Sequence, residues 1–448
     1  MPGKKDQTAD FPPAFSRRMK ALLGQGWDDF LLAHEQAAPV SIRINPLKWQ
    51  AAFAEELPVE GPVPWCKEGF YLKERPRFSA DPLWHAGAYY VQEASSMLIS
   101  HVLQHISIKS AVKALDLGAS PGGKSTLLLD YLPKGSLLLA NEPIRSRLPA
   151  LKENLARWGR ANALISQHRP AEIAATGLLF DLILVDAPCS GEGLFRKSPE
   201  ARREWTPGQA AFCATRQAGI LKDILPTLAE GGWLLYSTCT YQPEENEARV
   251  AQLVESGLEE VEISMPESWG VLRKTLGYQC YPHEVKGEGF YFALLHKPMT
   301  NPARKEKIPK ARNWLPIARR QREKIEATLP NLSAYALLEN KRHGLFALPE
   351  ELLPQALPIL ERLPRCRPLL RPGHLKKELF FPSGISALQS DLQQNRLSYE
   401  LSREEAESFI QGHPLPNRLD KRGLLLLSYR GLGLGWGKGI EGRINVKK

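Results

Sequence analysis

The chain has 448 residues, which is more than a single hydrophobic core usually holds, so two to four domains are expected. An apolar content of 43% and a charged content of 24% are those of a globular protein and exclude wholesale disorder. The 59 lysines and arginines exceed the 49 acidic residues. The resulting net charge of +10 suits a polyanionic partner without saying which one.

No apolar run approaches the roughly 18 residues of a membrane span, and the polar start of the chain lacks the apolar core of a signal peptide. The six cysteines stand at wide, irregular spacings that form neither a disulfide framework nor a Cys-x-x-Cys metal knuckle. We therefore expect a cytoplasmic, monomeric protein that binds no metal and does not enter a membrane.

The first two thirds of the chain divide into two predicted segments. Residues 1–83 are helical first and then, where prolines accumulate, form short strands. Residues 84–298 alternate apolar strand patterns with helical patterns, which is typical of a mostly parallel sheet covered by helices on both faces. The strands are expected at 112–117, 136–140, 163–165, 182–185, 233–236 and 290–295, and helices at 124–131, 146–158 and 210–228.

The remaining third changes character several times. Residues 299–312 are polar, charged and interrupted by proline, which indicates a basic linker. Residues 313–365 form a mixed segment with a basic start, and residues 366–448 consist of short strands that end in a glycine-rich run. Trp436 stands among those glycines, and a place in the domain core is favoured over stacking on a nucleobase.

A glycine loop follows the first strand of the central segment. The run Gly118, Ala119, Ser120, Pro121, Gly122, Gly123, Lys124 and Ser125 matches the phosphate-binding loop of nucleotide triphosphatases, so such an enzyme is one alternative. Two carboxylates oppose it. Asp116 stands just before the loop, where its charge would repel phosphates. Glu142 follows the next strand, about 20 residues on, where a carboxylate takes ribose hydroxyls. The pattern favours a ligand with a free ribose, such as S-adenosylmethionine.

Two cysteines stand at the ends of apolar runs. Cys189 follows LLFDLILV in the motif DAPCSG, and Cys239 follows GGWLLY in the motif STCTY. The carboxyl ends of parallel strands meet at one edge of a sheet, so both thiols are predicted near the glycine loop. Most cysteines after a strand are buried small hydrophobes, and that role suits Cys66, Cys213, Cys280 and Cys366 better than these two.

A pair of thiols beside a ribose-binding loop suits methylation of carbon 5 of cytosine. This carbon becomes nucleophilic only after a thiolate has added at carbon 6. A nearby acid must hold or protonate the ring, and Asp186, three residues before Cys189, is the candidate. The carbon-5 proton must leave after methyl transfer, which provides a role for the second thiol. A metal site is the competing interpretation, but no His or Cys stands at ligand spacing beside either cysteine.

Several motifs together resemble one known family. In order and in mutual spacing, DLGASPGGKS, NEPIRSR, FDLILVDAPCSGEGLFRKSPE, GGWLLYSTCTYQPEENE and GEGFYFALLHKP resemble the motifs of the RNA cytosine-C5 methyltransferases. The upstream runs SIRINP and YVQEASSM resemble the N-terminal segment of that family. The ending GLGLGWGKGIEGRI is similar to the F-type members, which act on ribosomal small-subunit RNA and carry a C-terminal PUA-like domain.

The resemblance implies a fold and a set of roles. The fold would be an α/β, Rossmann-like S-adenosylmethionine-dependent methyltransferase sheet, with a helical RNA-binding module at 1–83 and an α+β, PUA-like RNA-binding domain at 366–448. Cys239 would be the nucleophile and Cys189 would assist product release, although DNA cytosine methyltransferases use the Pro-Cys cysteine as nucleophile. Asp186 would contact the base and Lys124 would line the same pocket. The cofactor would be held by Gly118, Ala119, Ser120, Pro121, Gly122, Gly123, Lys124, Glu142 and Asp186, with the adenine contact near residues 167–168 left unassigned.

The expected partner is RNA, with 16S ribosomal RNA or the small ribosomal subunit first and transfer RNA as the alternative. Phosphate contacts would come from the N-terminal module, the linker and a basic cluster of Arg365, Arg367, Arg371, Lys376 and Lys377, although any single surface charge is more often merely solvated. A hypothesis of a different class is a catalytically inactive RNA-binding assembly factor with the same fold. The intact thiols, Asp186 and the glycine loop oppose it.

Overall fold

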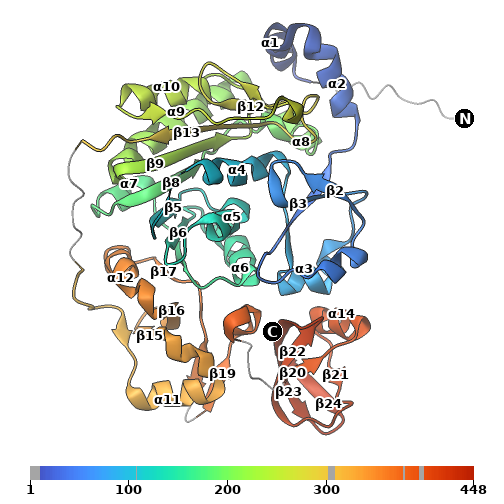
Figure 1. Cartoon of the computed structure of the whole chain (residues 1–448), viewed down its shortest axis with the longest axis vertical. Helices are drawn as coiled ribbons and strands as arrows, with labels where there is room; N and C mark the ends of the chain where they lie inside the picture. The colour runs from blue at the N-terminus through green and yellow to red at the C-terminus, as the bar shows by residue number, and fades with distance from the viewer. Residues whose placement is uncertain (1–10, 107, 301–307, 377–378, 393–397, 448) are drawn as a thin grey trace, which may run out of the picture.

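The computed structural model describes residues 11–106, 108–300, 308–376, 379–392 and 398–447. The start of the chain, residues 301–307 of the predicted linker, and Lys377 lie outside these ranges. Figure 1 shows the central sheet with helices on both faces, and two C-terminal parts side by side beneath it. Within the described ranges, no helix is long and apolar enough to cross a membrane.

The central sheet has the predicted parallel core. Five parallel strands lie in the order β9-β8-β5-β6-β7, and antiparallel strands extend the sheet at both edges, to ten strands in all. The parallel strands are β5 (Lys113–Asp116), β6 (Leu137–Asn141), β7 (Ala163–Ser166), β8 (Phe180–Asp186) and β9 (Leu228–Thr238). The added strands are β10 (Glu259–Glu260), β11 (Leu272–Arg273), β12 (Tyr278–Cys280), β13 (Phe290–His296) and β17 (Arg367–Pro368). Each predicted strand is present, with bounds that differ by a few residues.

Alternate residues of the strands pack into two hydrophobic cores, one on each face of the sheet. Leu138 and Ala140 of β6 pack on one face, and Leu137 and Leu139 pack on the other. One face is covered by α4 (Leu98–His105), α5 (Gly123–Tyr131) and α6 (Leu148–Trp158), and the other by α7 (Pro170–Ala174), α9 (Pro207–Ile224) and α10 (Glu247–Glu255). The predicted helix 210–228 ends earlier, at Ile224, because Pro226 has no N–H to continue it and Leu228 already begins β9.

The N-terminal module begins with two helices and continues as a small antiparallel sheet. The helices are α1 (Pro13–Leu23) and α2 (Trp27–Glu35), and the sheet order is β2 (Val59–Val63), β3 (Cys66–Leu72), β1 (Val40–Ile44) and β4 (Tyr89–Val91). The short helix α3 (Pro82–Ala86) precedes β4. Because β4 pairs with β1, this sheet extends past residue 83, and the predicted boundary falls inside the module.

The segment predicted as a separate domain at 313–365 shares a core with the central sheet. It contains β14 (Leu315–Pro316), β15 (Tyr335–Asn340), β16 (Gly344–Pro349), α11 (Arg319–Thr328) and α12 (Leu353–Arg362). Its residues Trp314, Leu338 and Leu360 belong to the same buried cluster as Leu164 and Val185 of the sheet. The strand β17 then pairs with β7, so the chain adds a strand to the central sheet before it enters the last domain.

The last domain is a five-stranded sheet of β20 (Ser398–Glu400), β22 (Gly423–Tyr429), β23 (Leu432–Ile440), β24 (Arg443–Lys447) and β21 (Leu415–Pro416). A hairpin of β18 (Gly373–Lys376) and β19 (Leu379–Pro382), with α13 (Gly384–Leu388), precedes it, and α14 (Arg403–Gln411) packs on it. Trp436 is buried and its Nε1 donates to Ser386 Oγ at 3.0 Å, so the prediction that it lies in the core is confirmed. Leu427 and Phe409 share a core with Leu72 and Leu83 of the N-terminal module.

Arg43 of β1 joins the N-terminal module to the central domain. Its side chain is fully buried, and its guanidinium donates to Gln92 Oε1 at 2.9 Å, Asp130 Oδ2 at 2.6 Å and Thr126 Oγ1 at 2.5 Å. Asp130 and Thr126 belong to α5, the helix that begins in the glycine loop. The N-terminal sheet therefore fixes the position of that helix through one buried, fully hydrogen-bonded charge.

Replacement of Arg43 by glutamine is expected to lower the free energy of unfolding by about 3–5 kcal/mol, because it breaks a buried ion pair on one side only. Arg160→Gln is the matched control. Arg160 also pairs with Asp130, at 2.9 Å, but its side chain is partly exposed, so a loss of about 1 kcal/mol is expected. Urea unfolding followed by tryptophan fluorescence measures both. Equal losses of stability in the two variants would show that the buried Arg43 ion pair contributes no more than the partly exposed Arg160 ion pair.

Candidate functional site

The strand order creates a site at the carboxyl edge of the sheet. After β5 the chain moves to β6 on one side, whereas β8, on the other side of β5, is reached only later. Ligands of open α/β sheets bind in the crevice at such a switch point. The glycine loop follows β5, the Cys189 loop follows β8 and the Cys239 loop follows β9. The topology thus brings the predicted loops to one place.

The two thiols are in direct contact. Asp186 at the end of β8 lies opposite Ser237 near the end of β9, and a few residues further on the two Sγ atoms of Cys189 and Cys239 are 3.1 Å apart. The backbone N–H of Cys239 also donates to Cys189 Sγ at 3.3 Å. Both thiols are partly exposed, whereas the other cysteines are buried, as predicted. The hydrogen bond with Cys239, together with the loss of water around the sulfur atom of this only partly exposed residue, raises the pKa of Cys189 well above its ordinary value, so Cys189 is held as a neutral thiol.

A buried carboxylate, Glu245, joins the two cysteine loops. It accepts from the Ser190 N–H at 2.9 Å, from Ser190 Oγ at 2.5 Å and from Gln217 Nε2 at 2.9 Å. Ser190 Oγ is also 2.8 Å from Thr240 Oγ1. Burial raises the pKa of Glu245. Glu245 is not among the residues predicted from the sequence, although its place six residues after Cys239 in the QPEENE motif was a usable signal.

A second buried carboxylate, Glu192, connects the Cys239 loop to α1. It accepts from the Tyr241 N–H at 3.1 Å and from Gln242 Nε2 at 2.7 Å, and it pairs with Arg18 of α1 at 2.6 Å. The N–H of Gly193, next to it, donates to the carbonyl of Cys239 at 2.8 Å. The backbone around Cys239 is therefore fixed from outside the central sheet, a feature that no sequence pattern indicated.

Lys124 and Asp186 form an ion pair beside the thiols. Lys124 Nζ lies 2.8 Å from Asp186 Oδ2, and Ser237 Oγ donates to Asp186 Oδ1 at 2.8 Å. Burial alone would lower the pKa of Lys124, but the negative charge of Asp186, with smaller contributions from Cys239 and Asp116, outweighs it and raises the pKa. Lys124 is therefore held as an ammonium ion next to Cys239.

The glycine loop and this ion pair line a cavity of about 190 Å³. The other wall is the segment 90–93 with Ser96, which belongs to the YVQEASSM motif. The glycines are required by close contacts: a Cβ at Gly118 would lie 2.7 Å from the carbonyl oxygen of Asp186, and one at Gly123 would lie 3.3 Å from the Tyr90 ring. Gly122, at φ +115°, has the left-handed backbone that starts α5.

Two buried carboxylates at this edge keep an unused acceptor. Glu142 accepts from the Ile144 N–H at 2.9 Å through Oε1, whereas its buried Oε2 has no hydrogen-bond partner and only a distant ion pair with Arg147, at 3.5 Å. Asp116 accepts from Ser125 Oγ at 2.5 Å through Oδ2, whereas Oδ1 has none. Burial raises the pKa of Asp116 to about 7.

Residues 167–168 stay without an assigned ligand contact. The His168 ring is buried and hydrogen-bonds Ser166 Oγ through Nδ1 at 2.6 Å, and burial lowers its pKa to about 4. Its ring is therefore neutral and engaged within the fold. Among the described residues, no group of three or more His, Cys, Asp or Glu side chains is arranged to hold a metal ion.

Comparison with solved structures shows the class of fold. A methyltransferase homolog protein from Pyrococcus horikoshii matches 64% of this chain and 96% of its own, with a TM-score of 0.55 and 28% sequence identity. The sheet and the loops at its carboxyl edge are thus those of a methyltransferase, and the predicted α/β, Rossmann-like fold class is confirmed.

Sequence comparison then shows the family. Models of the 16S rRNA methyltransferase RsmB/F, of the RsmF N-terminal domain and of the RsmF PUA domain match residues 104–296, 11–94 and 396–446. The ribosomal RNA small subunit methyltransferase F of Salmonella arizonae is 32% identical over 97% of this chain and 95% of its own. The Escherichia coli protein of that name is 31% identical over 98% and 95%. The chain belongs to this family.

Asp116 is expected to make stability depend on pH. Its pKa in the fold is about 7, above the roughly 3.9 of an unfolded aspartate, so the folded state binds the proton more tightly. Its contribution to stability is therefore present below about pH 4 and is lost as the pH rises to about 7. Asp116→Asn, which is neutral at every pH, should lack this loss.

Melting temperatures of both proteins between pH 4 and 8, without ligand, measure the effect. The other charged groups that face Asp116 are Asp186, Lys124 and Glu142, and they are present in both proteins. The advantage of Asp116→Asn should therefore grow up to about pH 7 and then stay constant. Parallel curves would show that Asp116 does not titrate in this range.

Proposed function

We propose that this protein transfers the methyl group of S-adenosylmethionine to carbon 5 of a cytosine in small-subunit ribosomal RNA. The observation that carries the proposal is the contact of two partly exposed thiols, 3.1 Å apart, beside the Lys124–Asp186 ion pair. The family supports RNA as the substrate class, because its members are named for ribosomal RNA of the small subunit and residues 396–446 match the PUA domain of that family.

The residues at the switch point fit S-adenosylmethionine. The Oε2 atom of Glu142 is a buried acceptor without a donor, which suits a ribose hydroxyl. The glycine loop from Gly118 to Lys124 allows close approach of a ligand to the backbone, and Asp186 closes the cavity on the thiol side. When bound there, S-adenosylmethionine supplies an electrophilic methyl group on a sulfonium ion. No described residue group calls for a metal.

The first step is addition of Cys239 to the base. The Cys239 thiol loses its proton to water, and the resulting thiolate forms a bond from Sγ to carbon 6, which turns carbon 5 into the nucleophilic end of an enamine. The Lys124 ammonium donates a hydrogen bond to the ring as negative charge develops on it. Asp186 contacts the base and orients Lys124 through their 2.8 Å ion pair. The Glu192 and Glu245 hydrogen bonds keep the Cys239 loop in place during this attack.

The remaining steps transfer the methyl group and free the enzyme. Carbon 5 takes the methyl group as its bond to the sulfonium sulfur breaks, which leaves S-adenosylhomocysteine. Carbon 5 then carries both the methyl group and its original proton. That proton is lost to water, the carbon 5–carbon 6 double bond forms again, and the bond from carbon 6 to sulfur breaks. The Cys189 thiol, held neutral at hydrogen-bond distance from Cys239 Sγ, stabilises the thiolate as it leaves.

The two thiols are expected to give opposite phenotypes. Cys239→Ala should abolish the protein–RNA adduct and reduce methylation by about a thousandfold or more, because nothing else activates carbon 5. Cys189→Ala should still attack and transfer the methyl group but stall at elimination. Denaturing electrophoresis with labelled small-subunit RNA should therefore show an adduct that accumulates only in the Cys189 variant.

Cys213→Ala is the matched control, since Cys213 is buried on α9 and should leave turnover unchanged. The reverse pattern of adducts would make Cys189 the nucleophile. Normal turnover in both variants would reject the mechanism, and an intact protein that binds RNA but never methylates it would favour the inactive assembly factor. A parallel assay with transfer RNA tests that alternative substrate.

Glu142 is expected to determine affinity for S-adenosylmethionine. Glu142→Gln should weaken binding by about 10- to 100-fold, because a hydrogen bond from a ribose hydroxyl to a charged acceptor is lost. Calorimetric titration measures it, with Glu153→Gln, an exposed residue of α6, as control. Tight binding of Mg-ATP by the unchanged protein, with no binding of S-adenosylmethionine, would support the triphosphatase alternative instead.

A further inference from the structure

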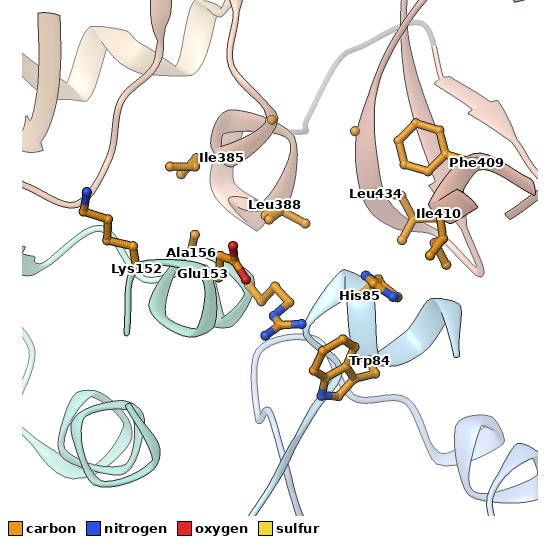
Figure 2. Close-up of a pocket in the computed structure, with 13 residues that line it drawn as sticks. Trp84, His85, Lys152, Glu153, Ala156, Ile385, Leu388, Phe409, Ile410 and Leu434 are labelled. Atoms are coloured by element: carbon orange, nitrogen blue, oxygen red, sulfur yellow. The ribbon is translucent and has the colours of Figure 1, made fainter. Parts of the chain in front are cut away.

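Two cavities lie where α6 of the central domain meets the C-terminal parts of the chain. The first, of about 540 Å³, is lined mainly by apolar side chains from α6, α3, α13, α14 and β23. Figure 2 shows it, with Leu388, Phe409, Ile410 and Leu434 above Trp84 and His85. Lys152 and Ile385 line this cavity and also the second one, of about 410 Å³, so the two are neighbours.

The second cavity has an unusual concentration of positive charge. Lys152 comes from α6, Arg342 from the turn between β15 and β16, Arg367 from β17, and Arg371 from the segment before β18. His343 completes the basic part of the wall. The other lining residues are Ile165, Phe346, Pro368, Leu369 and Ile385, and none of the described residues that line the cavity is acidic. We name Lys152, Arg342, Arg367 and Arg371 the basic pocket.

No negative charge of the described chain neutralises the basic pocket. None of its members forms an ion pair within the described ranges, whereas Arg365, only two residues from Arg367, makes two 2.8 Å contacts with Glu172. Glu153 follows Lys152 in the sequence but lines the other cavity, and in Figure 2 the Lys152 side chain extends away from it. Burial lowers the pKa of Lys152 and of Arg367, and repulsion from a neighbouring arginine adds to each shift.

Four long cationic side chains are gathered here from elements far apart in the sequence, without a counter-charge among the described residues. They repel one another, and a bound anion offsets that repulsion. Arginines bind phosphate through paired N–H donors, and lysine binds it as a point charge. We propose that the basic pocket is a phosphodiester-binding site for the RNA substrate, separate from the site of methyl transfer. This inference rests on the proposed function, because it concerns how the same RNA is held.

The location of the basic pocket determines which part of the RNA it can hold. Ile165 and Arg367 place it at the β7–β17 edge of the sheet, whereas Cys239 follows β9. The strands β6, β5 and β8 lie between β7 and β9, which separates the two sites by about 20 Å at the usual strand spacing. The basic pocket therefore binds the backbone of a flanking nucleotide, not the phosphate of the target cytosine.

The test is salt-dependent binding of the full-length protein to a small-subunit RNA transcript. For Arg367→Gln/Arg371→Gln, the slope of log affinity against log salt should decrease by about 0.7 for each lost contact, hence by about 1.4. The KM for RNA should rise while S-adenosylmethionine affinity and kcat stay unchanged. The control is Arg319→Gln/Arg422→Gln, which removes two exposed arginines that are already paired with Glu323 and Glu441 and should leave the slope unchanged.

Lys152→Gln/Arg342→Gln is the second test variant and should lower the slope similarly, even if the first variant is unstable. An unchanged slope in both pocket variants, with normal methylation, would reject RNA binding at the basic pocket and leave the proposed function intact. Absence of methylation by the unchanged protein would instead reject the function. A calorimetric titration with inorganic phosphate separates the two sources of phosphate: tight binding that the pocket variants lose, with RNA binding unaffected, would make this a small-anion site and reject the RNA contact.

Discussion

The site depends on the parallel pairing of β8 with β9. These strands are adjacent in the sheet and in register, so Asp186 lies beside Ser237 although 51 residues separate them in the sequence. The two loops that leave the strands can then meet, with a direct contact between Cys189 and Cys239. A register shift of a single residue would turn alternate side chains to the other face and separate the thiols. The chemistry therefore depends on the interior packing that fixes this register.

The N-terminal module acts on the site as a structural support. Arg18 reaches the Cys239 loop through Glu192, and Arg43 reaches α5 through Asp130 and Thr126. β4 and the segment after it also form one wall of the cavity beside the glycine loop. The module is packed in turn against the last domain, where Glu56 accepts from Tyr429 at 3.0 Å and pairs with Arg403 at 3.2 Å. The N-terminal module thus shares one core with the central sheet and another with the last domain, and their relative placement is part of the fold.

The sequence was sufficient where the signal was local. Apolar runs and the glycine loop predicted the strands and helices of the central sheet, and the small polar residues around Cys189 and Cys239 separated them from the buried cysteines. Contacts between segments far apart in the chain could not be predicted from these local patterns. Nothing in the sequence indicated that Trp314 and Leu360 would join the core behind β7 and β8, or that β17 would extend the sheet. The predicted basic cluster likewise divides in space, because Arg365 pairs with Glu172 whereas Arg367 and Arg371 join Lys152, a residue of another domain.

The buried carboxylates around the carboxyl edge fall into two kinds, which their hydrogen bonds distinguish. Glu245 and Glu192 each use both oxygens for donors of the protein, so they hold loops and have no free acceptor to offer a ligand. Glu142 and Asp116 each retain an oxygen without a hydrogen-bond partner, although a buried unpaired acceptor costs about 1–3 kcal/mol. Such a cost persists where a ligand's donor can remove it. Both unused acceptors lie beside the glycine loop, one after β6 and one before the loop itself, so these two carboxylate oxygens stand at the switch point where a ligand enters.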